Sequence, residues 1–106
     1  YNSAIMVITK AELDQYHIST GDTEGIVNYA LSINGIRLAV LIIERPDKVK
    51  LSLRSTGDFP ANEICKKYFA GGGHRNAAGG FSDEKLEAVR EKFNVILPEY
   101  KSLLIQ

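Results

Sequence analysis

The sequence predicts an α/β fold, a small mixed β-sheet flanked by helices, in a single domain of residues 1–106. Residues 36–44 contain the longest apolar run of the chain, Leu38 to Ile43, which indicates a central strand covered by helices on both faces. Residues 48–54 alternate strictly between apolar and polar side chains, as a strand with one buried face does. These two strands are close enough in sequence to pair as an antiparallel hairpin.

The preceding part of the chain alternates between strand and helix patterns. Residues 4–8 are apolar with β-branched members and predict a buried strand. Residues 10–16 are rich in helix formers and predict one or two helical turns. Asp22 or Thr23 is expected to cap the next helix, and Gly35 suits the left-handed position that follows its end. An Asn-Gly pair also fits a hairpin turn, but the segment before it lacks the alternation of a strand.

The following part predicts a helix, a short strand and a long helix. Pro60 favours a helix start, and residues 77–81 are expected to form one more short strand. Ser82 is a suitable N-cap for a last helix whose apolar residues continue at intervals of three and four to the end of the chain. Because that spacing continues past Pro98, we expect one helix with a kink. The predicted order of elements is β-α-β-β-α-β-α.

The charges are balanced in number but not in position. The chain has 13 Lys and Arg residues and 13 Asp and Glu residues. Residues 45–82 hold seven cations and three anions, a balance of +4, whereas both flanking segments are acidic. Arg54 ends the outward-facing row of its strand, and Arg75 lies in a glycine-rich segment. If the sheet brings them together they form an anion site; ordinary surface variation is the alternative.

The glycine-rich segment, residues 71–80, reads GGGHRNAAGG. It lacks the Lys-Ser/Thr ending of a phosphate-binding P-loop, and Asn76 stands where the dinucleotide fingerprint needs its third glycine. One glycine would be enough to cap the preceding helix, so a cap followed by a flexible loop is one interpretation. Three consecutive glycines also let a ligand approach the backbone, and His74 and Arg75 supply donors for a phosphate or a base.

The combination of this segment with two others resembles a known family. Leu51–Ser55 (LSLRS), residues 71–80 and the segment DTEGIVN at residues 22–28 are similar to the DHH-associated domain. This is the C-terminal domain of DHH-family phosphoesterases, which include RecJ-type exonucleases and the smaller nanoRNase and pAp-phosphatase enzymes. The resemblance covers essentially the whole chain. The C-terminal domain of alanyl-tRNA synthetase carries a related glycine-rich motif but typically lacks the histidine.

The resemblance implies a substrate-binding domain of a metal-dependent phosphoesterase that degrades short oligoribonucleotides or pAp. In that family an N-terminal DHH domain holds a dinuclear manganese centre, and the C-terminal domain binds phosphates and bases across a cleft. The implied partners are short single-stranded RNA or DNA or nucleotide phosphates, the DHH domain in cis, and a second copy if the full-length protein is a homodimer. The implied substrate contacts are Arg54, Ser55, Gly71, Gly72, Gly73 and His74, with Arg75 and Asn76 as further candidates.

Hydrolysis itself needs residues that this sequence does not supply. A two-metal hydrolase requires several carboxylates and histidines that converge, but the chain has only His17 and His74, with no Asp-His-His and no Asp-x-Asp. We therefore expect no catalytic residue, no metal ligand and no cofactor in this chain, and Mn²⁺ in a catalytic domain outside it. Cys65 lies on an apolar helix stripe, which favours packing over nucleophilic chemistry.

Other expectations follow from the start of the chain, its cysteine count and its hydropathy. The chain starts at Tyr1, and we expect it to be the C-terminal portion of a longer enzyme. With one cysteine and no apolar run near the ~20 residues of a membrane span, we expect a cytoplasmic protein without a membrane partner. Two alternatives to the enzyme domain are a freestanding single-strand RNA-binding module and a polyphosphate-binding relative resembling exopolyphosphatases.

Overall fold

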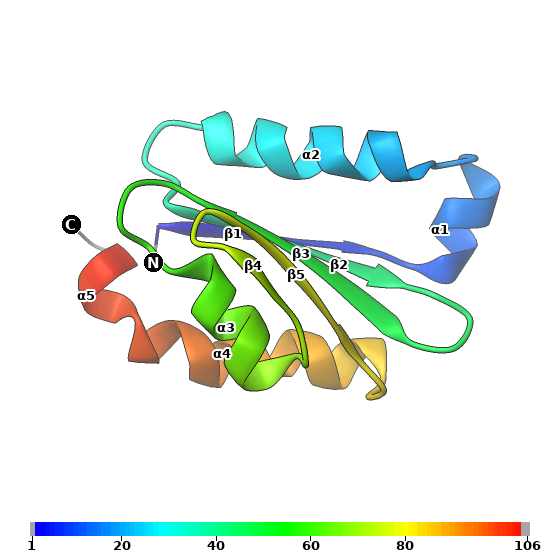
Figure 1. Cartoon of the computed structure of the whole chain (residues 1–106). Helices are drawn as coiled ribbons and strands as arrows, with labels where there is room; N and C mark the ends of the chain where they lie inside the picture. The colour runs from blue at the N-terminus through cyan, green and yellow to red at the C-terminus, as the bar shows by residue number, and fades with distance from the viewer. Residues whose placement is uncertain (1, 105–106) are drawn as a thin grey trace.

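The computed structural model describes residues 2–104, apart from the side chain of Thr20, and has the predicted architecture of a mixed sheet flanked by helices (Figure 1). The helical turns predicted at residues 10–16 are present at residues 10–15, whereas a strand at residues 72–74 and a short helix at residues 101–104 are not predicted from the sequence. The elements are β1 (Ser3–Ile8), α1 (Lys10–Gln15), α2 (Thr20–Ser32), β2 (Leu38–Glu44), β3 (Val49–Ser55), α3 (Ala61–Tyr68), β4 (Gly72–His74), β5 (Ala77–Ser82), α4 (Leu86–Glu99) and α5 (Lys101–Leu104).

The sheet has five strands in the order β1-β2-β3-β5-β4. β1 runs parallel to β2, and every other neighbouring pair is antiparallel. The predicted hairpin of β2 and β3 is confirmed, with Val40 opposite Leu53. The strand predicted at residues 4–8 is also present, but it lies at the edge of the sheet and is only half-buried for most of its length. β4, at the other edge, is the strand that the sequence analysis misses.

Two apolar layers hold the helices against the sheet. On one face, the rings of Phe59, Phe69 and Phe93 pack with α3, α4 and the apolar residues of β2 and β3. On the other face, Val27 and Ala30 of α2 pack against the alternate residues of β2. β2 is therefore fully buried from Leu38 to Ile43, as a strand between two helical layers must be.

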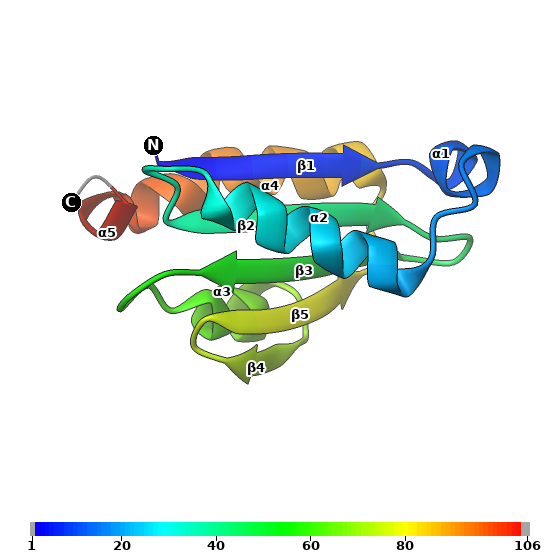
Figure 2. The same ribbon diagram turned by 90° about the horizontal axis from the view of Figure 1, so that it is seen from above.

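The two faces of the sheet are covered unequally. α3 and α4 lie under the whole of one face (Figure 1), with α3 packed against β4 and β5. On the opposite face α2 runs over β2 and β3 and leaves β5 and β4 uncovered (Figure 2). This open half-face carries the glycine-rich strands, so the uneven cover determines where a ligand can approach them.

The start of α2 differs from the prediction. The helix begins at Thr20 with Ser19 as its N-cap, not at Asp22 or Thr23. The backbone N–H of Ser19 donates to Asp22 Oδ2 at 3.0 Å, so Asp22 belongs to a capping box inside the first turn. That hydrogen bond lowers the pKa of Asp22. The predicted end is confirmed in outline, because the helix stops at Ser32 and Gly35 has a φ of +91°.

The last helix also differs from the prediction. Ser82 does not cap it: the Ser82 hydroxyl accepts from the Glu84 N–H at 3.1 Å in a turn, and α4 begins at Leu86. α4 ends one residue after Pro98, and the separate short helix α5 follows, so one continuous kinked helix is wrong. Proline removes a backbone donor and crowds the carbonyl one turn before it, which favours a break at this point. Within residues 2–104, no helix combines the length and apolar character that crossing a bilayer requires.

Candidate functional site

The strand register places Arg54 and His74 on the same face of the sheet. Arg54 of β3 is opposite Ala77 of β5, and Ala77 is opposite His74 of β4. Residues paired across neighbouring strands point to the same face, here the face that α2 leaves partly open. The two backbones are two strand spacings apart, roughly 10 Å. The sheet thus brings the basic strand end and the glycine-rich segment together, as the charge pattern suggests.

A shallow cleft of about 270 Å³ lies beside Arg54 on this open half-face. We call it the glycine cleft, because three glycines contribute to its lining and β5 supplies a continuous stretch of it. Helix α2 forms one wall through Glu24, and β3 supplies two cations, Lys50 and Arg54. Its lining residues are Glu24, Lys50, Leu51, Ser52, Arg54, Gly72, Ala77, Ala78, Gly79, Gly80 and Phe81.

The three consecutive glycines have different roles. A Cβ on Gly71 would overlap the carbonyl oxygen of Gly79, so this glycine allows β4 to approach β5. Gly73 has a φ of +141°, and a Cβ there would lie 2.8 Å from the carbonyl oxygen of Ala77. A Cβ on Gly72 would meet nothing within 4 Å, and this residue lines the glycine cleft. Of the three, Gly72 is the one that leaves room for a ligand.

The interpretation of a helix cap followed by a flexible loop is wrong for the glycine run. The residue with a left-handed backbone after α3 is Ala70, with a φ of +46°, and not a glycine. The N–H of Gly71 then donates to the Cys65 carbonyl at 3.0 Å, which closes the end of the helix. Gly72 and Gly73 continue as the edge strand β4, so the run is ordered backbone within the sheet.

Arg54 is held by helix α2 and by its own strand. Its Nη1 donates to the Leu53 carbonyl at 2.9 Å, and its Nη2 forms an ion pair with Glu24 of α2. The side chain of Arg54 is only 18% exposed. The predicted outward-facing row is therefore partly covered, and Ser52 in the same row is buried. Arg54 lines the glycine cleft, and its guanidinium has N–H donors beyond those used by the Leu53 carbonyl and Glu24.

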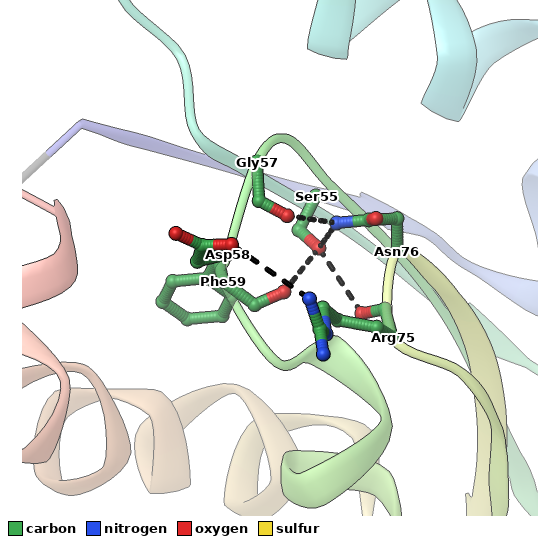
Figure 3. Close-up of polar contacts among 6 residues, drawn as sticks. All are labelled: Ser55, Gly57, Asp58, Phe59, Arg75 and Asn76. Carbon is green, nitrogen blue, oxygen red and sulfur yellow. Dashed lines mark hydrogen bonds and ion pairs between the residues drawn. The ribbon is translucent and has the colours of Figure 1, made fainter.

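Ser55 and Asn76 hold the turn between β4 and β5 in place (Figure 3). The buried Ser55 hydroxyl lies 2.8 Å from the Phe59 carbonyl oxygen and 3.2 Å from that of Arg75, and it accepts from Asn76 Nδ2 at 3.0 Å. Asn76 Nδ2 also donates to the Gly57 carbonyl at 3.1 Å. Both side chains are thus engaged with the protein in this structure. Their direct contact with a substrate stays a prediction, and their observed contacts position the turn that precedes Ala77.

His74 and Arg75 are both exposed at the tip of this turn. Arg75 Nη1 lies 3.7 Å from Asp58 Oδ1, and the two side chains are 62% and 94% exposed, so this ion pair is loose (Figure 3). His74 shares the face of Arg54, whereas Arg75 lies in the two-residue connection between the strands. The geometry favours His74 over Arg75 as the second donor of the site.

One aromatic ring borders the glycine cleft. Phe81 lies opposite Lys50 in the register and is 45% exposed, and Lys48 Nζ lies 4.4 Å from its ring centroid. Phe59 is buried in the core, and Tyr68 is half-buried and donates to Glu99. Phe81 is therefore the aromatic residue of this group that a base could reach.

Neither the cysteine nor the carboxylates form a reactive centre in the described part of the chain. Cys65 is buried in the core, and burial raises the pKa of its thiol to about 11, against a smaller opposing effect of Arg54. Among residues 2–104, no three His, Cys, Asp or Glu side chains converge so that they could hold a metal ion. The described residues therefore do not fit a dinuclear manganese centre.

Sequence reasoning leaves two charged cleft residues, Lys50 and Glu24, without a role in the site. Lys50 could have been found from Arg54, because residues four apart on one strand point to the same face. Glu24 reaches the site from a different helix, and only the tertiary packing of α2 brings it to Arg54. The sequence signal for Glu24 is indirect, because the DTEGIVN segment at residues 22–28 resembles the DHH-associated domain but the resemblance implies no role for this residue.

A family model described as the DHHA1 domain matches residues 3–99. The chain belongs to the DHHA1 domain family. The match covers both the strand that carries Arg54 and the glycine-rich segment, so the resemblance inferred from those motifs is confirmed.

Two proteins with higher sequence similarity to this DHHA1 domain are considerably longer than the chain. A 3′,5′-cyclic-nucleotide phosphodiesterase from Helicobacter pylori is 32% identical over 82 residues, which cover 69% of this chain and 22% of that protein. An exopolyphosphatase-related protein from Bacteroides fragilis is 40% identical with a TM-score of 0.92, covering all of this chain and 31% of that protein. In related proteins the DHHA1 domain accompanies an N-terminal DHH domain.

The fold also occurs outside this immediate group. The C-Ala domain of Aquifex aeolicus alanyl-tRNA synthetase has a TM-score of 0.65 and 12% identity, covering 98% of this chain and 91% of that one. At this identity the likeness concerns the fold alone. The closer similarity in sequence lies with the DHH-family phosphoesterases, to which DHHA1 domains belong.

Proposed function

We propose that this DHHA1 domain binds the phosphate-bearing end of a short oligonucleotide or nucleotide phosphate in the glycine cleft. It would serve as the substrate-binding domain of a cytoplasmic, metal-dependent DHH-type phosphoesterase that degrades short oligoribonucleotides or pAp. The observation that carries the proposal is the row of Arg54, Ala77 and His74, which places two donors on either side of a residue with a minimal side chain.

Each part of the site has a distinct role in this proposal. Arg54 donates to phosphate oxygens, because a planar guanidinium matches their geometry and retains its charge. His74 donates from across Ala77 to a second oxygen or to a base edge. Gly72 allows the ligand to lie close to the backbone of β4, and the Phe81 ring offers a surface on which a base can stack. The domain thereby orients the ester for attack by groups on another domain.

The proposal assigns the chemical step to a different part of the full-length protein. The manganese centre that the resemblance implies would belong to an N-terminal DHH domain, since the described residues of this chain do not fit it. The similar proteins support a phosphate-bearing substrate, because one is a cyclic-nucleotide phosphodiesterase and another is exopolyphosphatase-related. A homodimer of the full-length protein also belongs to the proposal.

Binding of a 5′-phosphorylated oligoribonucleotide to the chain tests the proposal. We expect saturable binding that weakens as salt rises, because ion pairs with phosphate release counterions. Arg54→Ala should weaken binding by roughly tenfold, as loss of a charge-assisted contact does. Arg90→Ala, on the exposed side of α4, is the matched control for the loss of one cation. Equal binding by the wild type and Arg54→Ala, with no salt dependence, would contradict the proposal.

Polyphosphate binding is a second candidate, which the exopolyphosphatase-related relative favours. Polyphosphate would use the two cations that line the cleft, Lys50 and Arg54, but it offers neither a base nor a sugar hydroxyl. Direct competition between tripolyphosphate and the oligoribonucleotide separates the two functions. A freestanding RNA-binding module is distinguished differently, by whether the gene encodes an Asp-His-His motif upstream of this domain.

A further inference from the structure

Glu24 places a carboxylate in a cleft whose other charged lining residues are the cations Lys50 and Arg54. Its Oε2 accepts from Arg54 Nη2, and the Glu24 side chain remains 41% exposed beside the cleft. Glu24 and Arg54 both line the same cleft, together with Lys50. The site therefore presents two positive charges and one negative charge to a ligand. A site that only binds anions would have no use for the negative charge, because it repels them.

The packing of α2 holds Glu24 in this position. The capping box of Ser19 and Asp22 defines the start of the helix, and Val27 is fully buried against the sheet. Glu24 lies one turn before Val27 and next to the buried Thr23, so the helix directs it toward the edge of β3. The packing of α2 thus places Glu24 at the wall of the cleft, where its carboxylate pairs with Arg54.

Arg54 can bind a phosphate while it keeps Glu24 as a partner. A guanidinium has five N–H donors, and the contacts with Leu53 and Glu24 each use one nitrogen, Nη1 and Nη2. The remaining donors are available to the ligand. A ligand that binds Arg54 therefore also lies beside the Glu24 carboxylate, and its chemistry must suit both groups.

This requirement separates two classes of phosphate ligand. Every oxygen of polyphosphate is an acceptor, and each phosphate adds negative charge, so a neighbouring carboxylate repels it. A nucleotide carries hydrogen-bond donors next to its phosphate, namely ribose hydroxyls and base N–H groups, which a carboxylate accepts. We propose that Glu24 is the specificity-determining residue of the glycine cleft, favouring a ribonucleotide by accepting one of these donors and disfavouring polyphosphate by repulsion. This inference rests on the proposed function of the cleft.

Glu24→Gln tests the role of the negative charge alone, because the amide keeps the shape of the side chain and an oxygen that accepts from Arg54. We expect this variant to bind tripolyphosphate roughly tenfold more tightly, since a nearby like charge is removed. It should bind 5′-AMP about three- to tenfold more weakly, because a neutral acceptor replaces a charged one. Glu24→Asp keeps the charge with a shorter reach and should retain the exclusion of tripolyphosphate.

Glu91→Gln is the matched control, since Glu91 lies exposed on α4 across the sheet from the cleft. It should leave the preference between the two ligands unchanged. The 2′,3′-dideoxy analogue of AMP identifies the hydrogen-bond donor that Glu24 accepts from. If Glu24→Gln weakens the binding of AMP and of the analogue equally, the donor is a base N–H. If it weakens the binding of AMP alone, the donor is a ribose hydroxyl.

Two results must be kept apart in this experiment. If Glu24→Gln changes the binding of tripolyphosphate and AMP by the same factor, or changes neither, the specificity role of Glu24 is overturned. If Arg54→Ala also leaves the binding of both ligands unchanged, then the proposed function of the cleft fails as well. If Arg54→Ala weakens binding but Glu24→Gln has no effect, only the specificity role of Glu24 is overturned.

Discussion

Arg54 and His74 lie on one face of the sheet with Ala77 between them, although they come from strands 20 residues apart in the sequence. The small side chain of Ala77 leaves the space between the two donors open. A larger residue there would separate them from a common ligand. The antiparallel register of β3, β5 and β4 therefore brings the two donors to one face of the sheet.

Replacement of His74 should weaken ligand binding and leave the fold intact. We expect His74→Ala to lower the affinity for a 5′-phosphorylated oligoribonucleotide by about three- to tenfold, because one hydrogen bond to a charged group is lost. His17→Asn is the control: His17 is exposed outside the glycine cleft and has a φ of +52°, which asparagine tolerates. Titration monitored by fluorescence anisotropy measures both, and a fall in affinity for His17→Asn alone would contradict the assignment.

Alanine at Gly71 should lower stability, whereas alanine at Gly72 should lower ligand affinity with little change in stability. Gly71→Ala introduces a Cβ against the Gly79 carbonyl and should lower the free energy of unfolding by about 2–3 kcal/mol. Gly72→Ala meets no protein atom within 4 Å and should change stability by less than about 1 kcal/mol. It should nevertheless reduce ligand affinity, because the methyl group projects into the cleft. Chemical denaturation and ligand titration of the two variants provide the comparison.

Loss of the Ser55 hydroxyl should destabilise the protein by about 1–3 kcal/mol, since buried carbonyl groups lose their partner. Ser55→Ala removes the acceptor of Asn76 and the donor to Phe59. Ser102→Ala, at an exposed position of α5, should have little effect. Urea denaturation measures the difference. A Ser55→Ala variant as stable as Ser102→Ala would show that this network does not hold the turn.

The capping box of α2 predicts a loss of stability in acid. Hydrogen bonds from Ser19 lower the pKa of Asp22 below its ordinary value of 3.8, so the folded state binds the proton less readily than the unfolded state. This contribution is therefore present above that ordinary value and is lost as the pH falls through the lower folded-state value. The wild type should lose more stability than Asp22→Asn between about pH 5 and about pH 2. Thermal unfolding across this range, with Asp47→Asn as the control, measures it, and parallel pH profiles for the wild type and Asp22→Asn would contradict the prediction.

Cys65 should be nearly inert to alkylation in the folded protein. Burial raises the pKa of its thiol to about 11 from an ordinary value of 9.0, so the thiolate fraction at pH 8 falls by about a hundredfold. Iodoacetamide labelling followed by mass spectrometry should be slow in buffer and fast in denaturant. Rapid labelling of the native protein would show that α3 opens readily and exposes Cys65.

The patterns that predict correctly are those with strong periodicity. Unbroken apolar character identifies β2, and strict alternation identifies β3 and its register with β2. β4 is not predicted because Gly72 and Gly73 have no side chains that could form a polar and apolar pattern, and because glycine is uncommon in strands. The start of α2 at Thr20 is not predicted because the capping box of Ser19 and Asp22 has Asp in place of the usual Glu or Gln.

Only part of the candidate site can be predicted from the sequence. Arg54 and His74 belong to short motifs, and their residues can be identified without a structure. Glu24 contributes through the packing of a helix onto a strand 30 residues away, which no local pattern encodes. Ser55 and Asn76 lie in those same motifs, yet in the structure their polar groups contact the protein. A motif identifies which residues meet, and only the packing shows which of them remain available to a ligand.

The absence of side chains along Gly72 and Gly79 has a thermodynamic consequence for the cleft. Glycine and alanine have no rotamers to lose, so a ligand that lies on them immobilises no side chain of this part of the surface. Arg54 is already restrained by Leu53 and Glu24 before a ligand arrives. The entropic cost of binding on the protein side is therefore confined to groups such as the exposed His74 and the half-buried Lys50. A weakly charged, short ligand can bind such a preorganised surface, whereas a flexible basic patch would need many more contacts to hold it.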